Sequence, residues 1–230
     1  MLDKDFHRSL LPISSVSLLG TCETKFLENI QGRQRVTTQM KVGKVMHEKL
    51  AAPLPKITME EVIEKIAKGG RGGIRELPVT DGKYKLIGRI DQLELLGMNG
   101  SGKNDSRIID DKYPKRPYTQ IPLYQKLQLA TYATAVDNSD KLSSICEVIG
   151  VRLTYREANT HRVMGTFNIE GKELDTCKDH VGIAADVAWK LYGKQKEPEH
   201  RRFDVASGEW IACWCEGADS HQDKLFRAKY

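Results

Sequence analysis

Residues 86–113 read LIGRIDQLELLGMNGSGKNDSRIIDDKY, and this stretch decides the fold. A strand-like run precedes a polar loop from Gly97 to Asp105, and the short run Arg107–Tyr113 follows it, which predicts strands at 84–96 and 107–113. A similar run at 74–79 precedes them across the turn signal Asp81-Gly82, so the first two strands should form a hairpin. Pro114 should end the third strand.

Helical patterns lie on both sides of these strands. A first helix is expected from Ser14 and Ser15 through Ile30, with Cys22 on it. A second helix should carry Val42, Val45, Met46 and Leu50, and a third should begin at a Thr58/Glu61 capping box and end near 69–70. Further along, the patterns predict helices at 120–136 and 174–192 and strands near 145–155 and 161–169. The last stretch is expected to be a connector to a compact tail.

This order predicts an α/β fold whose mixed central sheet is flanked by helices. At 230 residues the chain is long enough for one sizeable core, so we expect a single domain. Its parts would be a helical N-terminal portion (1–72), a catalytic core (73–170), and a C-terminal helix with a short, Cys- and His-containing tail (171–230).

Composition indicates the cellular location and the classes of partner to expect. The net charge of +5 is compatible with a polyanionic partner, although many ordinary enzymes share it. No window is apolar enough for a membrane span, and residues 1–11 lack the features of a secretory signal. The odd number of cysteines, five, argues against a disulfide framework. We therefore expect a soluble protein in the cytoplasm with no membrane partner.

The last strand of the triplet carries a chemically suggestive pattern. Asp110 and Lys112 are two residues apart, so their side chains leave the same face, whereas Asp111 points away and can offer its backbone carbonyl. If Asp91 lies alongside, two carboxylates and that carbonyl form a set of hard oxygen ligands suited to magnesium or manganese. The alternative is a solvated salt bridge.

A metal ion at such a place has a definite chemistry. It lowers the pKa of a bound water and stabilises charge that grows on a phosphodiester. The ammonium of Lys112 would position the nucleophile or neutralise the pentavalent state. The residues therefore suit hydrolysis of a phosphate ester.

The pattern is one of five motifs in a fixed order: Gly43–Leu50, Arg75–Val79, Gly88–Asp91, Ile109–Lys112 and Gln128–Tyr132. In order and spacing they resemble the RecB-like nucleases of the PD-(D/E)xK group. Within that group the chain looks most like the CRISPR-associated single-strand exonucleases and exonuclease V. The resemblance implies a restriction-endonuclease-like core and metal-dependent cleavage of DNA from single-stranded ends.

The same resemblance implies roles for individual residues. His47 would be a further metal ligand beside Asp91 and Asp110, and Lys112 would be the catalytic lysine. The pair Gln128 and Tyr132, which share a helix face, would lie beside the site. Glu76 on the first hairpin strand is a candidate for an additional contact to the metal or its ligands; a solvated carboxylate is the alternative.

The cysteines form a second candidate constellation. Related nucleases often hold a 4Fe-4S cluster with one cysteine before the histidine motif and three near the C-terminus. Here Cys22 could be the first, but the tail has Cys213 and Cys215 as C-x-C, with His221 in place of the last cysteine. Such a set could hold zinc instead, or the cysteines could be structural. Cys146 and Cys177 are expected in the core.

Further residues are candidates for DNA contact. Arg71, Lys115 and Arg116 flank the predicted site in sequence and could meet phosphates, although solvated charge is the alternative. Tyr118 could stack on an unpaired base. The match of Gly97–Lys103 to G-x-x-x-x-G-K lacks the following Ser or Thr, so we do not expect ATP binding there.

Two other functions remain open from the sequence. The chain could be the nuclease subunit of a larger DNA-processing complex, such as a CRISPR adaptation assembly, which would bring protein partners. It could also be a catalytically silent DNA-binding scaffold, which the intact order of the motifs argues against.

Overall fold

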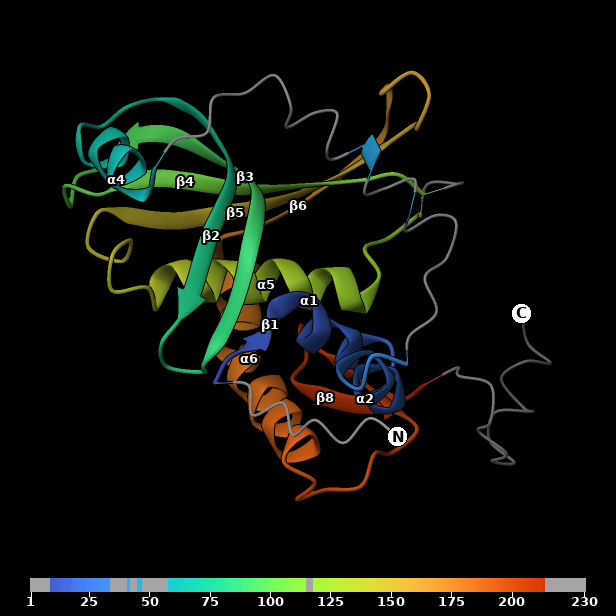
Figure 1. The fold of residues 1–230 in the computed structure, drawn as a ribbon. Helices are drawn as coiled ribbons and strands as arrows, with labels where there is room; N and C mark the ends of the chain where they lie inside the picture. Colours follow the sequence, from blue (N-terminus) through green and yellow to red (C-terminus); the bar gives the residue numbers. More distant parts are fainter. Residues whose placement is uncertain (1–8, 34–40, 42–44, 47–57, 115–117, 214–230) are drawn as a thin grey trace.

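The fold is a mixed α/β arrangement around a six-stranded sheet (Figure 1). The computed structural model describes residues 9–33, 41, 45–46, 58–114 and 118–213. The strands run in the order β1-β3-β4-β5-β6, with β2 paired to β3. Their bounds are β1 (Leu11–Pro12), β2 (Gly72–Asp81), β3 (Leu86–Met98), β4 (Asn104–Lys112), β5 (Cys146–Arg156) and β6 (Val163–Glu170).

Helices cover the sheet and lead into it. Their bounds are α1 (Ile13–Val16), the 3-10 helix η1 (Ser17–Gly20), α2 (Glu23–Ile30), α4 (Met59–Ala67), α5 (Leu123–Asp137) and α6 (Gly171–Tyr192). A separate two-stranded sheet, β7 (Arg201–Asp204) with β8 (Glu209–Ala212), lies near α2 (Figure 1). Among the described residues, no helix is both long and apolar enough to cross a membrane.

The strand directions explain why α5 lies where it does. β2, β3 and β4 are successive antiparallel neighbours, but β4 and β5 are parallel. Parallel neighbours cannot be joined by a tight turn and need a crossover connection. α5 is that connection, and it lies across one face of the sheet (Figure 1).

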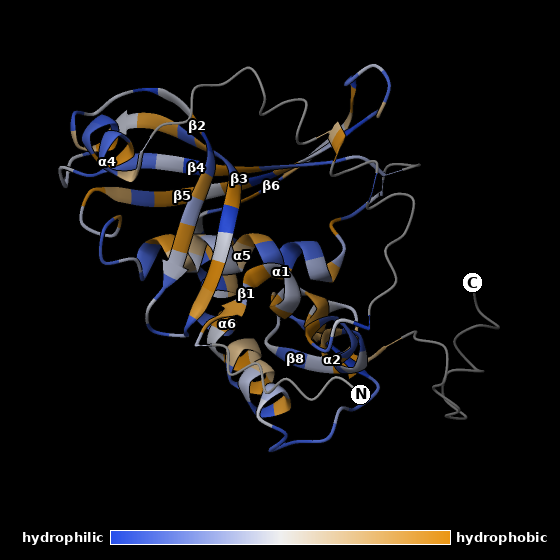
Figure 2. Cartoon of the chain, in the orientation of Figure 1, coloured by the Kyte–Doolittle hydropathy of each residue, from blue (hydrophilic) through white to orange (hydrophobic). Residues whose placement is uncertain are grey.

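α5 is buried on nearly all sides from Leu127 to Val136, because the sheet, η1 and α6 all pack against it. Two of its hydroxyl side chains, Thr131 and Thr134, therefore bond back to the carbonyls of Leu127 and Ala130, at 2.7 and 3.0 Å. The strands, by contrast, carry both hydrophilic and hydrophobic residues along their length (Figure 2). The helix and the sheet thus form two packed layers around one hydrophobic core.

Two glycines permit close approaches to α5. A Cβ on Gly20 would lie 2.5 Å from the Cα of Tyr124, and a Cβ on Gly88 would lie 2.7 Å from Cε1 of Tyr132. Both distances are shorter than any real contact. Larger residues would therefore push η1 or β3 away from the helix.

The structure confirms most of the predicted elements. The hairpin and the third strand are present, and Thr58 and Glu61 form both hydrogen bonds of the capping box. Cys146 and Cys177 are buried in β5 and α6. The predicted α/β class with a mixed sheet flanked by helices is confirmed.

Three predicted elements were wrong in detail. The expected helix from Ser14 to Ile30 is broken into α1, η1 and α2, because Gly20 meets α5 and the chain tightens there. Cys22 thus lies before α2 in extended backbone rather than on a helix. The helix expected from 120 begins at Leu123, after Pro122. The supposed connector before Trp210 contains the β7–β8 hairpin, and the helix expected around 42–50 falls mostly outside the described residues.

The contact between Gly88 and Tyr132 gives a stability prediction. Gly88→Ala should lower the free energy of unfolding by about 1–3 kcal/mol, because the added methyl group overlaps an aromatic ring that cannot move far. Urea denaturation measures this. The control is Gly82→Ala, where a Cβ meets nothing within 4 Å and the change should stay within about 0.5 kcal/mol. Equal effects of the two variants would contradict the packing argument.

Candidate active site

Two carboxylates face each other where β3 and β4 part. The last paired residues of this ladder are Gln92 and Ile109, and the next pair in the same register is Asp91 with Asp110. The two side chains are hydrogen-bonded to one another. Asp110 is almost fully buried, with only 3% of the residue exposed. Two acidic side chains therefore lie together in a buried place, just beyond the last paired residues of β3 and β4.

Lys112 joins the two carboxylates, because its side chain leaves β4 on the same face as that of Asp110. Its Nζ lies 2.9 Å from Oδ1 of Asp110, and its side chain is 26% exposed. Burial lowers the pKa of Lys112, but the charges of Asp110 and Asp91 raise it by more, so the net pKa lies above its usual value. Lys112 is therefore a firmly held cation at neutral pH.

Asp91 is held in its protonated form by the same surroundings. Burial, followed by the charge of Asp110, raises the pKa of Asp91 to about 8, although Lys112 acts in the opposite direction. Two close carboxylates in a poorly solvated place cannot both ionise without a compensating cation. Without a further cation, the pair shares a proton at neutral pH.

Glu76 approaches from the neighbouring strand. In the register of the hairpin it stands opposite Asp91, between the pairs Arg75–Gln92 and Leu77–Ile90. Its backbone has a φ of 55°, which is rare for a residue with a side chain and costs conformational energy. Its carboxylate lies 3.5 Å from Arg89 and contributes to the raised pKa of Asp91. Glu76 is thus one of four described non-glycine residues with a positive φ, and it stands opposite Asp91.

The donor set fits a hard divalent cation. Oδ2 of Asp110 is buried and accepts no hydrogen bond from the described residues. Buried polar atoms without partners are rare in folded proteins, so an unbonded carboxylate oxygen points to a cation as its partner. Asp91, Asp110 and the Asp111 carbonyl would supply oxygen ligands of the kind that Mg²⁺ and Mn²⁺ prefer. The side chain of Asp111 turns to the other face, where Arg156 binds it at 3.0 Å.

The predicted helix pair lies on the site side of α5. Tyr132 is 6% exposed, and its pKa is raised to about 12, mainly by burial and next by the charge of Asp110, while a hydrogen bond with Gln128 acts in the opposite direction. Its phenol also influences the pKa of Lys112. The structure thus brings Tyr132, with Gln128 bonded to it, to the carboxylate and lysine group.

A tyrosine network next to the site was not predicted. Tyr155 donates a hydrogen bond to Gln125 Oε1 at 2.6 Å, and Gln125 donates one to the hydroxyl of Tyr124 at 2.9 Å. Tyr124 is hydrogen-bonded to Tyr118, and its pKa responds to Lys112. The spacing of Tyr124, Gln128 and Tyr132, at i, i+4 and i+8 on one helix face, was the available signal.

The remaining predicted site residues divide into three groups. Arg71 packs near Gly97, six residues along β3 from Asp91, so it lies roughly 20 Å from the carboxylates at the rise of a strand. Cys22 and Cys213 meet, but they do so together with His200, which the sequence did not suggest. Five predicted residues fall outside the described part of the chain: His47, Lys115, Arg116, Cys215 and His221.

Comparison with known proteins identifies the superfamily. Residues 29–188 match the family model described as the PD-(D/E)XK nuclease superfamily. Among solved structures, a protein of Eubacterium rectale provisionally described as an exonuclease has a TM-score of 0.50 at 13% identity, with 86% of this chain and 89% of that one covered. An alkaline exonuclease of Laribacter hongkongensis has a TM-score of 0.41 at 10% identity, with 81% and 89% covered. No curated protein matches the sequence.

The shared proton predicts how metal binding depends on pH. Carboxylate ligands must be ionised to bind a metal, so Mn²⁺ should displace the proton of Asp91. Because the pKa of Asp91 is about 8, the affinity for Mn²⁺ should rise as the pH approaches 8 and level off above it. Calorimetric titration in buffers of different ionisation enthalpy measures both the affinity and the released proton. Equal affinity at about pH 6 and about pH 9, with no proton released, would contradict this prediction.

Proposed function

Because the chain belongs to the PD-(D/E)XK nuclease superfamily, we propose that it is a metal-dependent deoxyribonuclease of the RecB-like group that degrades DNA from single-stranded ends. The observation that carries the proposal is the environment of Asp110. One of its oxygens binds Lys112, and the other is buried and accepts no hydrogen bond from an amide, hydroxyl or ammonium of the described residues. Leaving such an oxygen unsatisfied costs about 1–3 kcal/mol or more, which a bound cation would offset.

The metal would be held by side chains from two strands. Asp91, Asp110 and the backbone carbonyl of Asp111 are the proposed ligands, with His47 as a further one. Magnesium or manganese bound there supplies positive charge that activates a water molecule and stabilises the charge developing on the phosphate. The binding of this cation also removes the repulsion between the two carboxylates.

Lys112 has an electrostatic role in this proposal. Its raised pKa favours the charged ammonium over the free amine that a general base would need. It instead neutralises charge on the phosphate oxygens as the water oxygen bonds to phosphorus. The ester P–O bond breaks, the water loses its proton to solvent, and the departing oxygen takes up a proton and leaves as a hydroxyl group.

The tyrosine network supports binding of an unpaired strand. Tyr118 is 47% exposed, and its ring lies 5.5 Å from that of Tyr155. It borders a hollow of about 1080 Å³ whose lining also includes Tyr124, Phe167, Lys25, Lys126 and Arg202. Glu173 and Asp204 also line it, Lys126 pairs with Glu173 at 3.2 Å, and Lys25 pairs with Glu28 at 3.0 Å. The proposal therefore rests on the aromatic faces, because stacking of bases on such faces is typical of single-strand binding sites. Tyr124 connects this hollow to Lys112.

Two rival functions lead to different expectations. A silent DNA-binding scaffold would have no need for a buried carboxylate oxygen without a hydrogen bond, so the state of Asp110 weighs against it. A nuclease subunit of a larger DNA-processing complex would keep the same chemistry and add protein partners. Cleavage by the isolated chain separates the scaffold from both nuclease functions.

Removing either partner of the central ion pair should abolish cleavage. Asp110→Asn keeps the shape and removes the charge, and Lys112→Gln removes the ammonium. Each should reduce the cleavage rate by at least about 10²–10³-fold, as expected for groups that stabilise transition-state charge. End-labelled single- and double-stranded DNA, with Mg²⁺, Mn²⁺ or chelator, provides the assay.

The matched control for the lysine variant is Lys172→Ala, an exposed position at the start of α6. It should cleave at the wild-type rate. Full activity in Lys112→Gln, or wild-type cleavage in chelator, would overturn the proposal. If no substrate is cut but DNA still shifts on a gel, the scaffold is the better description.

Substitutions of Tyr118 test whether single-stranded DNA binds by base stacking or only by electrostatic attraction. Tyr118→Ala should weaken binding of single-stranded DNA by about 1–3 kcal/mol, because one base loses its aromatic platform. Tyr118→Phe should keep nearly full affinity, and duplex binding should change little in either variant. Fluorescence anisotropy with Ca²⁺ in place of Mg²⁺ measures affinity without cleavage. Equal losses for single strands and duplexes would exclude stacking at Tyr118.

A further inference from the structure

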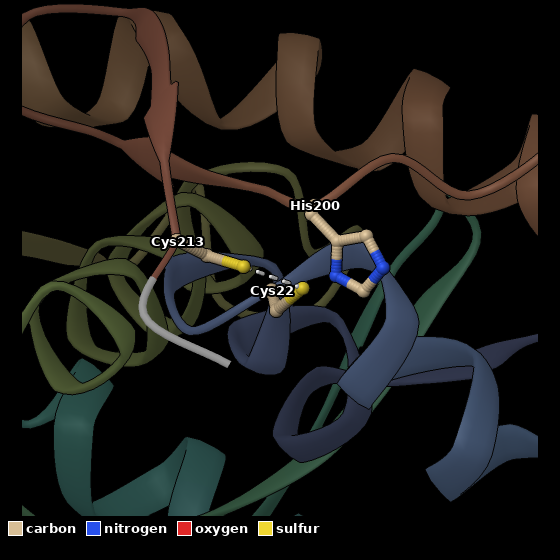
Figure 3. Close-up of side chains that lie close together, drawn as sticks. All are labelled: Cys22, His200 and Cys213. Atoms are coloured by element: carbon tan, nitrogen blue, oxygen red, sulfur yellow. Dashed lines mark hydrogen bonds between the residues drawn. The ribbon is translucent and has the colours of Figure 1, made fainter. Parts of the chain in front are cut away.

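A second group of metal-binding side chains lies away from the carboxylates. The sulfur atoms of Cys22 and Cys213 and a ring nitrogen of His200 all lie within 4.8 Å of one another (Figure 3). The two sulfurs are 2.9 Å apart and both cysteines are buried, whereas His200 is exposed. The residues come from three segments: Cys22 precedes α2, His200 precedes β7, and Cys213 follows β8.

Neighbouring contacts hold these segments together. The fully buried carboxylate of Glu23, next to Cys22, accepts hydrogen bonds from Lys196 at 2.8 Å, the Glu199 amide at 2.9 Å and Arg201 at 2.7 Å. The amide of Cys213 donates to the carbonyl of His200 at 3.2 Å. The backbone on each side of the three ligands is therefore fixed by other bonds, and the site is largely preformed.

From this geometry we propose that Cys22, His200 and Cys213 bind a single zinc ion. Thiolate and imidazole are the usual protein ligands of zinc, and one tetrahedral zinc places its ligand atoms roughly 3.6–3.8 Å apart. The three ligand atoms already lie within 4.8 Å, so small side-chain rotations are enough. A water molecule completes the four-coordinate site.

The same geometry does not fit the iron-sulfur cluster that the sequence resemblance implies. Each ligand of a four-iron cluster binds a different iron, so its ligands surround the cluster and stand far apart. Here the two sulfurs lie 2.9 Å apart and converge on one point. An imidazole that the cysteine pattern did not include takes part in the group. The described residues thus suit one ion.

A zinc ion here would tie distant parts of the chain together. Cys22 and Cys213 are 191 residues apart, and Cys22 closely follows η1, which packs against α5 through Gly20. Closing so long a loop stabilises the native state, since the unfolded chain loses more freedom as loop length grows. The ion would stabilise the scaffold that carries Tyr124 and Tyr132 without touching the reaction.

Metal analysis of the full chain tests the site. The protein is purified without chelator and dialysed against a weak one, and metal content is measured by mass spectrometry. Wild type should keep about one zinc per chain, and Cys22→Ser, His200→Ala and Cys213→Ser should each lose most of it. The control Cys177→Ala changes a buried thiol outside the group and should keep the zinc. Asp110→Asn should also keep it while losing cleavage, which separates this site from the proposed nuclease site.

Cobalt substitution of the wild-type protein avoids dependence on variants that fold poorly. Co²⁺ in this site should show intense visible bands of a tetrahedral ion and thiolate charge-transfer absorption. Three results would overturn the proposal: iron with acid-labile sulfide in place of zinc, full zinc content in His200→Ala, or wild type without zinc whose mass is lower by two hydrogens because Cys22 and Cys213 are joined as a disulfide.

Discussion

Asp91, Asp110 and Lys112 lie together in a buried place, and their mutual interaction dominates the electrostatics of the site. Removing a carboxylate from water costs several kcal/mol, and two of them side by side repel. The chain tolerates this arrangement because Lys112 pairs with Asp110 and because Asp91 keeps a proton, with its pKa near 8. A site with these properties is poised for a divalent cation, which would replace the shared proton and satisfy the remaining oxygen of Asp110.

The strands β3 and β4 and the helix α5 together position these residues. The β3–β4 ladder ends just before the carboxylates, so the strands hold the pair at the edge of the paired region. α5 joins β4 to the parallel strand β5 and brings Tyr132 near enough to influence the pKa of Lys112, and Gly88 makes room for the ring of Tyr132. The strained backbone of Glu76 is placed opposite Asp91. The strand pairing, the crossover helix and the unusual backbone of Glu76 therefore all lie next to the carboxylate pair.

The sequence predicted those features that depend on local pattern. The two-residue spacing of Asp110 and Lys112 on a predicted strand placed them on one face, and the turn signal at Asp81-Gly82 placed Asp91 on the adjacent strand. Features that depend on distant contacts were missed. The helix breaks where Gly20 closely approaches Tyr124, and Glu23, next to Cys22, binds Lys196 and Arg201 on either side of His200. Neither contact has a periodic signal.

Anomalous diffraction from a crystal of the protein soaked in Mn²⁺ tests whether the carboxylates bind a metal. A manganese peak is expected between the carboxylates of Asp91 and Asp110, within ligand distance of the Asp111 carbonyl, and it should be lost in Asp110→Asn. A protein that cleaves DNA but shows no peak there, or shows one only at another place, would contradict it.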